Sequence, residues 1–389
     1  MPSFESFAPE DAATAAAMLA HAAAGQLVVV PHGNRTKLRT PGDPSRAATL
    51  STVRLTRGLA HYAGDLVATA PAGCTLRDVN AALASERQWI PLDPPFGDRT
   101  TIGGMVASND SGPRRHRFGS PRDLILGIEV ALTSGKVARA GGRVVKNVAG
   151  YDLGRLFCGS LGSLGLITSV TFKLAPLARA SRTVVARFDR PQAAVAAALE
   201  LAATPALTPS SIEIVAPTPR LFVRFESTLR SSEQMAAASV ALLAPHARDV
   251  AVLDGVAEAA LWSDHHVQES PRDGLVATVS VLPTNAAHPI DLVERLAGEF
   301  GIAWSVTGRV GLGVLRVVAR SEPAVLQRFA AALRTAMTVQ QGHVQFVVGA
   351  EVIGDQFESR GPVGAAATAF AVKQRFDPAG ILPYPWARS

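Results

Sequence analysis

Apolar and polar positions change their pattern twice along the chain, which divides the sequence into three parts. In the first part, an Ala-rich stretch from Ala12 predicts a helix, with Asp11 at its positive end and Gly25 able to end it. The apolar run Gln26–Val30 predicts a short buried strand, and Pro31–Lys37 predicts a loop directly after it.

The second part is rich in glycine. Thr75 and Asp78 form a capping-box pattern, which predicts the start of a helix that continues through Leu83. Between Thr100 and Gly165, frequent glycines separate short apolar runs, and the run Ile125–Ala140 predicts two strands joined by a turn.

The third part begins after Pro176, where strands alternate with Ala-rich helices in the order β-α-β-β-α-β. Much the same order recurs from about Leu275. This predicts an antiparallel sheet with helices on one face, as in a duplicated ferredoxin-like unit. A final helix is predicted to end at Asp377 and Pro378.

Composition narrows the class of protein. Of 389 residues, 48% are hydrophobic and 18% charged, which excludes a disordered chain. The net charge is +6, but the sequence contains no block of basic residues, so we expect no nucleic-acid partner. Two cysteines exclude a disulfide framework and favour a reducing compartment. The Ala-rich start lacks a basic segment and no run of 18 apolar residues occurs, so we expect neither a signal peptide nor direct membrane insertion.

Glycine-rich loops point to a phosphate-containing ligand. Backbone amides at glycine-rich turns and helix starts bind anions. Two candidates, His32–Lys37 and Thr100–Gly112, are far apart in sequence, and Gly159–Gly165 is a third glycine cluster. A cofactor with a central pyrophosphate could use both loops. Neither the Rossmann nor the Walker A spacing occurs, which disfavours NAD and GTPase functions.

Several segments resemble a known family. PHGNRTK, TTIGGMVASNDSG, RVVKNVAGYDL, GSLGSLGLITSVTFKLAP and KQRFDPAGILP resemble the FAD-binding proteins of the vanillyl-alcohol-oxidase (PCMH) type, and within them the FAD-binding E subunits of glycolate oxidase (glycolate dehydrogenase). The resemblance covers about residues 20–178, is weak through the middle of the chain and returns at 364–383.

The resemblance implies an α+β fold with a two-lobed, PCMH-type FAD-binding domain. This domain would cover residues 1–178, with lobes of about 1–55 and 56–178. A smaller α+β, ferredoxin-like cap domain would cover 179–350. Residues 351–389 would form a C-terminal helix and tail that return to the FAD domain.

The resemblance also assigns cofactor-binding positions to this sequence. Amides of the first loop would hold the FAD pyrophosphate, and these residues are His32, Gly33, Asn34, Arg35 and Thr36. The second loop would line the pyrophosphate and flavin side through Thr101, Ile102, Gly103, Gly104, Ser108, Asn109 and Gly112. Gly119, Gly165 and Ile167 would complete the cleft. Covalent relatives have histidine near the position of Arg35, so we expect non-covalent FAD.

The chain departs from the family at several positions. Asn34 and Arg35 stand where relatives commonly have glycine, and Leu161 replaces a glutamate. The motifs H-x-G-D-G-N-x-H and E-H-G-x-G of 2-hydroxy-acid dehydrogenases are absent; Glu351 is the nearest remnant. His265 and His266 are adjacent, and helical neighbours point about 100° apart. We therefore expect no metal site, a solvated helix end there, and no identifiable catalytic residues.

Other polar and aromatic residues leave alternatives open. Arg114, Arg115 and Arg117 form a basic cluster that either binds an acidic substrate or partner, or is an exposed loop that steers phosphate. We expect Tyr151 and Asp152 to fix a turn. The tryptophans Trp262, Trp304 and Trp386 are expected to fill the core or an interface.

The resemblance implies the FAD-binding subunit of a multi-subunit glycolate oxidase, in which a second FAD-binding subunit performs the oxidation of the 2-hydroxy acid. An iron–sulfur subunit would take the electrons. The complex is expected in the cytoplasm, docked to a membrane, if at all, through a partner. Two alternatives remain: a stand-alone FAD-dependent 2-hydroxy-acid dehydrogenase, and a flavin-free scaffold subunit, which Asn34, Arg35 and Leu161 motivate.

Overall fold

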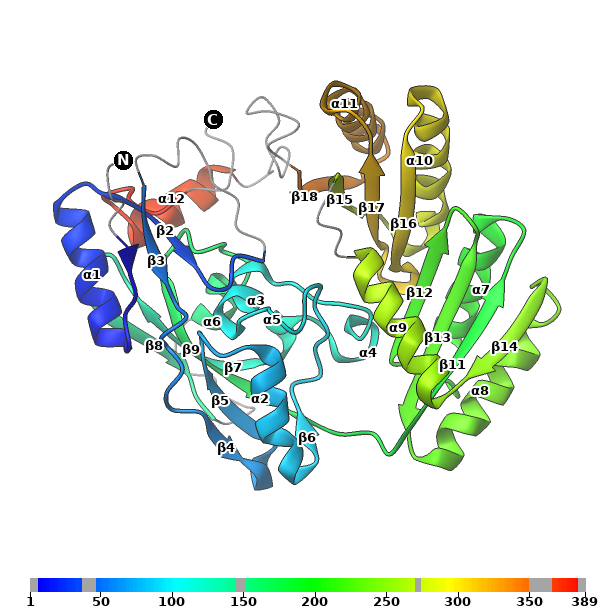
Figure 1. The fold of residues 1–389 in the computed structure, drawn as a ribbon, viewed down its shortest axis with the longest axis horizontal. Coiled ribbons are helices and arrows are strands. Elements are labelled where there is room, and N and C mark those ends of the chain that lie inside the picture. Colours follow the sequence, from blue (N-terminus) through cyan, green and yellow to red (C-terminus); the bar gives the residue numbers. More distant parts are fainter. Residues whose placement is uncertain (1–5, 37–46, 144–151, 270–273, 350–365, 384–389) are drawn as a thin grey trace. The chain divides into compact units, whose positions relative to one another are not determined.

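The computed structural model of the chain describes residues 6–36, 47–143, 152–269, 274–349 and 366–383. The chain forms two compact units, and each contains segments that are far apart in sequence (Figure 1). Unit 1 consists of residues 1–111, 118–177 and 362–389, and unit 2 of residues 112–117 and 178–361. Both mix helices and strands, which confirms the predicted α+β class.

The first lobe of unit 1 is a small parallel sheet with one helix. Its strand order is β1-β3-β2, and the strands are β1 (Ser6–Phe7), β2 (Val28–His32) and β3 (Ala47–Ser51). Helix α1 (Ala12–Ala24) is capped as predicted, since Asp11 accepts a 2.7 Å hydrogen bond from the amide of Thr14. Gly25 follows the last turn of the helix, and strand β2 with its loop comes shortly after it.

The second lobe is an antiparallel five-stranded sheet with the strand order β4-β5-β9-β7-β8. Its strands are β4 (Ala60–Tyr62), β5 (Val67–Pro71), β7 (Ile125–Ala131), β8 (Val137–Gly141) and β9 (Leu166–Lys173), and β6 (Gln88–Trp89) pairs separately with β10 (Ala175–Pro176). Helix α2 (Leu76–Leu83) begins at the predicted cap Thr75. The short helices are α3 (Ile102–Ser108), α4 (Arg115–Phe118), α5 (Pro121–Leu124) and α6 (Leu153–Phe157). Both lobes share one hydrophobic core, which fixes the loops at their strand ends.

The end of the chain completes unit 1. The ring of Phe376, the last residue of helix α12 (Ala366–Phe376), lies edge-on against Phe157 with 5.4 Å between ring centroids. The amide of Val29 in β2 donates a 2.8 Å hydrogen bond to the carbonyl of Ile381. Residues from both ends of the sequence therefore contribute to the same core.

Unit 2 is an eight-stranded sheet whose strands all pair antiparallel, in the order β14-β11-β13-β12-β16-β17-β15-β18. The strands are β11 (Ala180–Arg187), β12 (Ser211–Ala216), β13 (Arg220–Ser227), β14 (Asp249–Leu253), β15 (Leu275–Ser280), β16 (Ala303–Arg309), β17 (Val314–Arg320) and β18 (His343–Val348). Four helices cover one face: α7 (Pro191–Ala203), α8 (Leu229–Leu243), α10 (Ala287–Phe300) and α11 (Pro323–Val339). The predicted order, β-α-β-β-α-β twice, is confirmed.

The other face of this sheet carries helix α9 (Gly255–Glu269), which lies between the two halves in sequence (Figure 1). Ile212 and Ile214 of β12 enter the main core, whereas Val215 contacts Trp262 of α9 in a separate small cluster. This alternation shows that α9 packs on the face opposite the four other helices. No helix among the described residues combines the length and the apolarity that crossing a bilayer requires.

Candidate functional site

The loop after strand β2 presents backbone amides that have no hydrogen-bond partner in the described part of the chain. Among the described residues, the amides of Gly33, Asn34, Arg35 and Thr36 donate no hydrogen bond, and this loop is partly exposed. Arg35 has a φ of 53°, in the left-handed region that glycine adopts most easily. A turn of this kind, with successive free amides, is suited to binding an anion.

The two predicted phosphate loops lie side by side. A Cβ atom added to Gly33 would be 2.2 Å from Oγ1 of Thr101, so only a glycine allows this approach. The Asn34 side chain donates a 2.9 Å hydrogen bond to the carbonyl of Arg99, just before the second loop. Glycine at position 33 therefore allows the close contact between the two loops.

The second loop differs in detail from the expectation. The amides of Ile102 and Gly103 donate 2.9 Å hydrogen bonds to the carbonyls of Cys74 and Ala72, so both are already used within the protein. A Cβ atom on Gly103 would be 2.9 Å from that of Ala72. Gly104, in contrast, is exposed. Ile102 and Gly103 thus hold the loop in place, and Gly104 is the part that faces outward.

The third glycine segment joins the other two. The amides of Gly159 and Leu161 donate hydrogen bonds of 3.0 and 2.8 Å to the carbonyls of Val106 and Ala107 at the end of α3. A Cβ atom on Gly162 would be 3.3 Å from the ring of Pro31 in β2. Three segments separated by up to 130 residues of sequence therefore meet around the end of β2, as expected of a shared ligand site.

The remaining predicted positions have mixed surroundings. The Ser108 hydroxyl donates a 2.8 Å hydrogen bond to the carbonyl of Gly104. Asn109 has a φ of 50°, and its side-chain oxygen accepts hydrogen bonds from the amide of Arg122 and the thiol of Cys158. Gly165 is held against the carbonyl of Ala131, and Gly119 against the Asp123 side chain. Ile167 is buried in the core, and Gly112 lies where the chain passes from unit 1 to unit 2. The role of these residues in cofactor binding remains a prediction.

The His32 side chain belongs to the first loop. Its Nδ1 lies 2.8 Å from the carbonyl oxygen of Gly33, and its Nε2 lies 3.1 Å from the Arg35 guanidinium. Burial lowers the pKa of His32, and the charge of Arg35 lowers it further, although the contact with Gly33 acts in the opposite direction. At neutral pH the loop carries its positive charge on Arg35. The free amides and this cation fit a diphosphate group.

The basic cluster of the sequence is engaged within unit 2. Arg114 makes a two-pronged ion pair with Glu226, with hydrogen bonds of 3.0 and 2.8 Å, and Arg117 donates to the Glu226 carbonyl. Burial alone would raise the pKa of Glu226, but the hydrogen bonds and charge of Arg114 and the charge of Arg224 lower it to about 2. Both readings of the cluster were therefore wrong for Arg114, which is neither exposed nor open to an acidic ligand.

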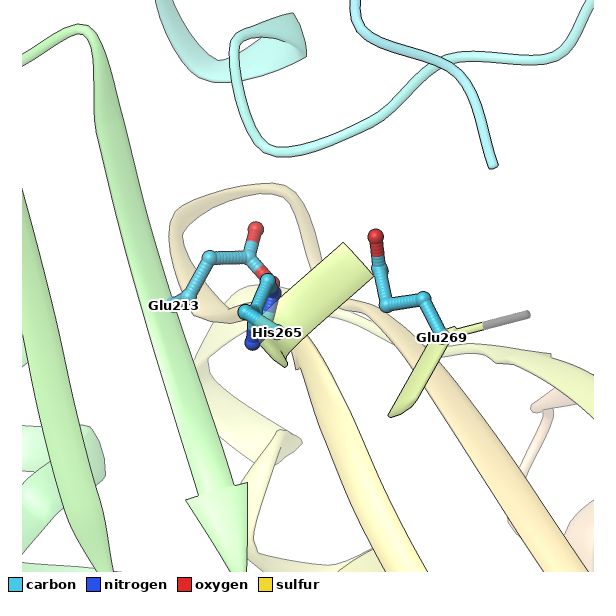
Figure 2. Close-up of side chains that lie close together, drawn as sticks. All are labelled: Glu213, His265 and Glu269. Atoms are coloured by element: carbon cyan, nitrogen blue, oxygen red, sulfur yellow. The ribbon is translucent and has the colours of Figure 1, made fainter. Parts of the chain in front are cut away.

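A second group of polar residues, which the sequence did not indicate, lies together in unit 2. His265 is buried, with 1% of its surface exposed, which corrects the expectation of a solvated helix end. It lies beside Glu213 of β12, and Glu269 follows one turn later on α9 (Figure 2).

Trp262 is buried as expected. Trp304 packs against the main core, and Asp152 caps α6. Tyr151, Glu351 and Trp386 lie outside the described residues.

Residues 309–316 carried a usable sequence signal. They read R-V-G-L-G-V-L-R, which keeps both glycines of H-x-G-D-G-N-x-H at their spacing and has arginine in place of each histidine. Arg309 and Arg316 both lie buried on the same sheet face as Glu213. Because both histidines are replaced, the segment does not match the motif by its metal-binding residues, and only the two glycines remain as a signal.

Comparison with known proteins agrees with this geometry. Residues 6–141 match the family of the FAD binding domain. The chain is 47% identical over 142 residues to glycolate oxidase subunit GlcE of Escherichia coli (strain K12), a match that covers 36% of this chain and 40% of that protein. It is 36% identical over 151 residues to glycolate oxidase subunit GlcD of Bacillus subtilis (strain 168), covering 39% and 32%.

Further similarities extend the comparison. D-lactate dehydrogenase of Archaeoglobus fulgidus is 31% identical over 196 residues, covering 50% of this chain and 44% of that protein. A solved structure of alkyldihydroxyacetonephosphate synthase superposes with a TM-score of 0.74 at 15% identity, covering 99% of this chain and 77% of that one. The fold is therefore that of the PCMH-type flavoproteins. The sequence matches span less than half the length of each of these curated relatives.

Proposed function

Because residues 6–141 form an FAD-binding domain, we propose that this chain is the non-covalent FAD-binding subunit of a complex that oxidises glycolate to glyoxylate. The observation that carries the proposal is the 47% identity over 142 residues to a glycolate oxidase subunit. The partners would be a second FAD-binding subunit, which oxidises the 2-hydroxy acid, and an iron–sulfur subunit, which receives the electrons.

Some residues of unit 1 would bind the cofactor directly, and others would hold the binding loops in place. The free amides of residues 33–36 and the Arg35 guanidinium would bind the diphosphate. The close contact between Gly33 and Thr101 would fix the distance between the two loops. Bound FAD supplies two-electron redox chemistry. Thr101 and the amides of Ile102 and Gly103 would act by fixing the start of α3 rather than by contact with the cofactor.

The proposal is tested by purification of the chain alone and with its partners. The chain alone should be yellow, with a flavin absorbance spectrum, and acid precipitation should release the FAD, as expected for a non-covalent cofactor. Co-expression with the second flavoprotein and the iron–sulfur protein should give a complex that reduces an artificial acceptor with glycolate. A colourless chain that does not take up added FAD would instead indicate a scaffold subunit.

A second candidate is a stand-alone dehydrogenase for a small 2-hydroxy acid. The similarity to D-lactate dehydrogenase of Archaeoglobus fulgidus favours it. Against it stands the absence from the sequence of H-x-G-D-G-N-x-H and E-H-G-x-G. Turnover of glycolate or D-lactate by the purified chain alone, with an artificial electron acceptor, would decide for this candidate and against the accessory role.

A further inference from the structure

Strand β14 forms one edge of the eight-stranded sheet in unit 2. It pairs with β11 on one side, and no other described strand pairs with it on the other side. Five consecutive residue pairs, from Arg187 with Asp249 to Thr183 with Leu253, keep one register without a bulge. The outer side of such an edge strand carries backbone N–H and C=O groups that can pair with a further strand.

The sequence of β14 lacks the features that usually protect an edge. It reads D-V-A-V-L, so its three central positions carry neither a proline nor a charge. Asp249, Ala251 and Val252 are exposed, and Val252 shows 46% of its surface. Proline, a central charge or a bulge would hinder the addition of a strand, whereas β-branched apolar residues favour it. This sequence therefore suits an edge that another strand covers.

The two valines of β14 lie on the sheet face that the four helices cover. Val250 and Val252 lie opposite Ala186 and Val184 of β11, which belong to the main core of unit 2. Val250 packs against this core, whereas Val252 is exposed. A second strand beside β14 would bring its own side chains against Val252 and extend the core across the edge.

The polar and apolar order on this face is complementary to itself. Side chains alternate between the two faces of a strand, so the valines share their face with Arg248 and Asp254 at the two ends. The order Arg-Val-Val-Asp becomes Asp-Val-Val-Arg in the opposite direction. A two-fold axis through Ala251, perpendicular to the sheet, therefore places each arginine opposite an aspartate and each valine opposite a valine. A parallel arrangement would place like charges opposite each other, which is unfavourable.

The two end charges are available for such a contact. Arg248 and Asp254 are both exposed. Within the chain, Arg248 forms an ion pair with Asp189, and Asp254 lies 3.4 Å from Arg182. Exposed ion pairs contribute little to the stability of a folded chain. Each charge can therefore also interact with an opposite charge on a second copy.

Helix α8 leaves room for a second copy beside the edge. It contacts both β11 and β14, and Figure 1 shows it next to β14. The same two-fold axis would bring the α8 helix of a second copy to the same face of the joined sheets. The exposed residues of α8 include Ala237, Ala238 and Ala241, and short side chains allow two helices to approach closely.

We propose that strand β14 pairs antiparallel with β14 of a second copy of this chain, so that the two sheets of unit 2 join into one. The contact consists of the backbone ladder, four valines around the axis and an Arg248–Asp254 pair at each end. Two five-residue strands bury less area than a standard interface, so we expect a reversible dimer with a dissociation constant of roughly 1–100 μM. This self-association does not depend on the proposed function.

Analytical ultracentrifugation of the full chain between about 1 and 200 μM tests the proposal. The wild type should show a monomer–dimer equilibrium. Val252→Lys should weaken the dimer by roughly tenfold or more, because it places two ammonium groups in the valine cluster. Val339→Lys is the matched control, since Val339 lies at the end of α11 with 80% of its surface exposed and should leave the equilibrium unchanged.

Exchange of the end charges tests the register. Arg248→Asp places two aspartates opposite each other at both ends and should weaken the dimer by roughly three- to tenfold. The double variant Arg248→Asp with Asp254→Arg restores opposite charges between the copies and should recover the dimer. The same double variant places like charges beside Asp189 and Arg182 within the chain. An effect on the single chain therefore cannot explain such a recovery.

Three results would overturn the proposal. The first is a wild type that stays monomeric at every concentration. If Val252→Lys then prevents assembly with the partner subunits, the edge binds a partner of different sequence instead. The second is a dimer that Val252→Lys and Arg248→Asp leave unchanged, because its interface would lie elsewhere. The third is a double variant that dimerises no better than Arg248→Asp.

Discussion

The Nζ atom of Lys373 donates a 2.9 Å hydrogen bond to the carbonyl oxygen of Ser163, 210 residues earlier in the chain. It also donates to the carbonyl of Leu382 and forms an ion pair with Asp377. Asp377 in turn accepts hydrogen bonds from the amides of Ile381 and Leu382. A single buried ammonium group therefore connects the last helix, the tail after it and the third glycine segment of the candidate FAD site.

We expect Lys373→Met to destabilise the protein by roughly 3–5 kcal/mol, because it leaves the buried Asp377 without its counter-charge. Urea unfolding followed by circular dichroism measures this change. The double variant with Asp377→Asn should recover part of the loss, and Lys136→Met at an exposed turn should be neutral. Equal stability of Lys373→Met and the wild type would show that the contact contributes nothing.

Gly33→Ala should reduce FAD retention and destabilise unit 1 by about 1–3 kcal/mol. The added Cβ would be 2.2 Å from Oγ1 of Thr101, which is buried and also caps α3 through the amide of Gly104. Flavin absorbance per protein after gel filtration, together with thermal unfolding, reports both effects. Gly64→Ala, where a Cβ meets nothing within 4 Å, is the control. Full flavin content in Gly33→Ala would contradict the role given to the loop contact.

Arg35→Gly should separate the stability of the first loop from its function. Arg35 has a left-handed backbone, which costs a residue with a side chain about 1–2 kcal/mol, so glycine should stabilise the flavin-free protein. If the guanidinium contacts the diphosphate, the same change should weaken FAD binding, whereas Arg35→Lys should retain most of it. Fluorescence titration with FAD measures the affinity. Tighter binding in Arg35→Gly would mean that Arg35 obstructs the site.

Unit 2 should lose stability in acid through Glu226. Arg114 and Arg224 hold the pKa of this carboxyl at about 2, well below its ordinary value of 4.5. A carboxyl with a lowered pKa in the folded state stabilises that state fully above about pH 5, and the contribution of about 3 kcal/mol disappears as the pH falls towards 2.

The Glu226→Gln variant, which cannot ionise, provides the comparison. Its stability should be lower than that of the wild type at pH 7, and the difference between the two proteins should shrink steadily between pH 5 and 2. Unfolding in urea at several pH values measures this difference. A difference that does not change with pH would show that the ion pair with Arg114 has no net effect on stability.

Local chemistry made much of the fold predictable. Asp11 and Thr75 indicate helix starts in the sequence because a side-chain oxygen before an apolar run accepts hydrogen bonds from amides within the same few residues. The repeated strand and helix order after Pro176 followed from apolar periodicity in the same way. The proximity of the two glycine-rich loops was predictable because amides at turns and helix starts bind anions, and one pyrophosphate could use both loops.

The cluster on α9 was not predictable in this way. Glu213, His265 and Arg316 come from three separate elements, and strand register, which sequence does not specify, brings them together. The pairing of Arg114 with Glu226 is equally remote in sequence. Part of the signal is present in α9, because Glu258, Trp262, His265 and Glu269 recur at the spacing of one helical stripe.

The return of the last helix to unit 1 has a consequence for biosynthesis. A ribosome releases strand β2 early, yet the carbonyl of Ile381 that pairs with this strand emerges only after all of unit 2. The hydrogen bond between Val29 and Ile381 can therefore form only after the whole of unit 2 has been synthesised, so unit 1 receives its last core residues later than the sheet that interrupts it.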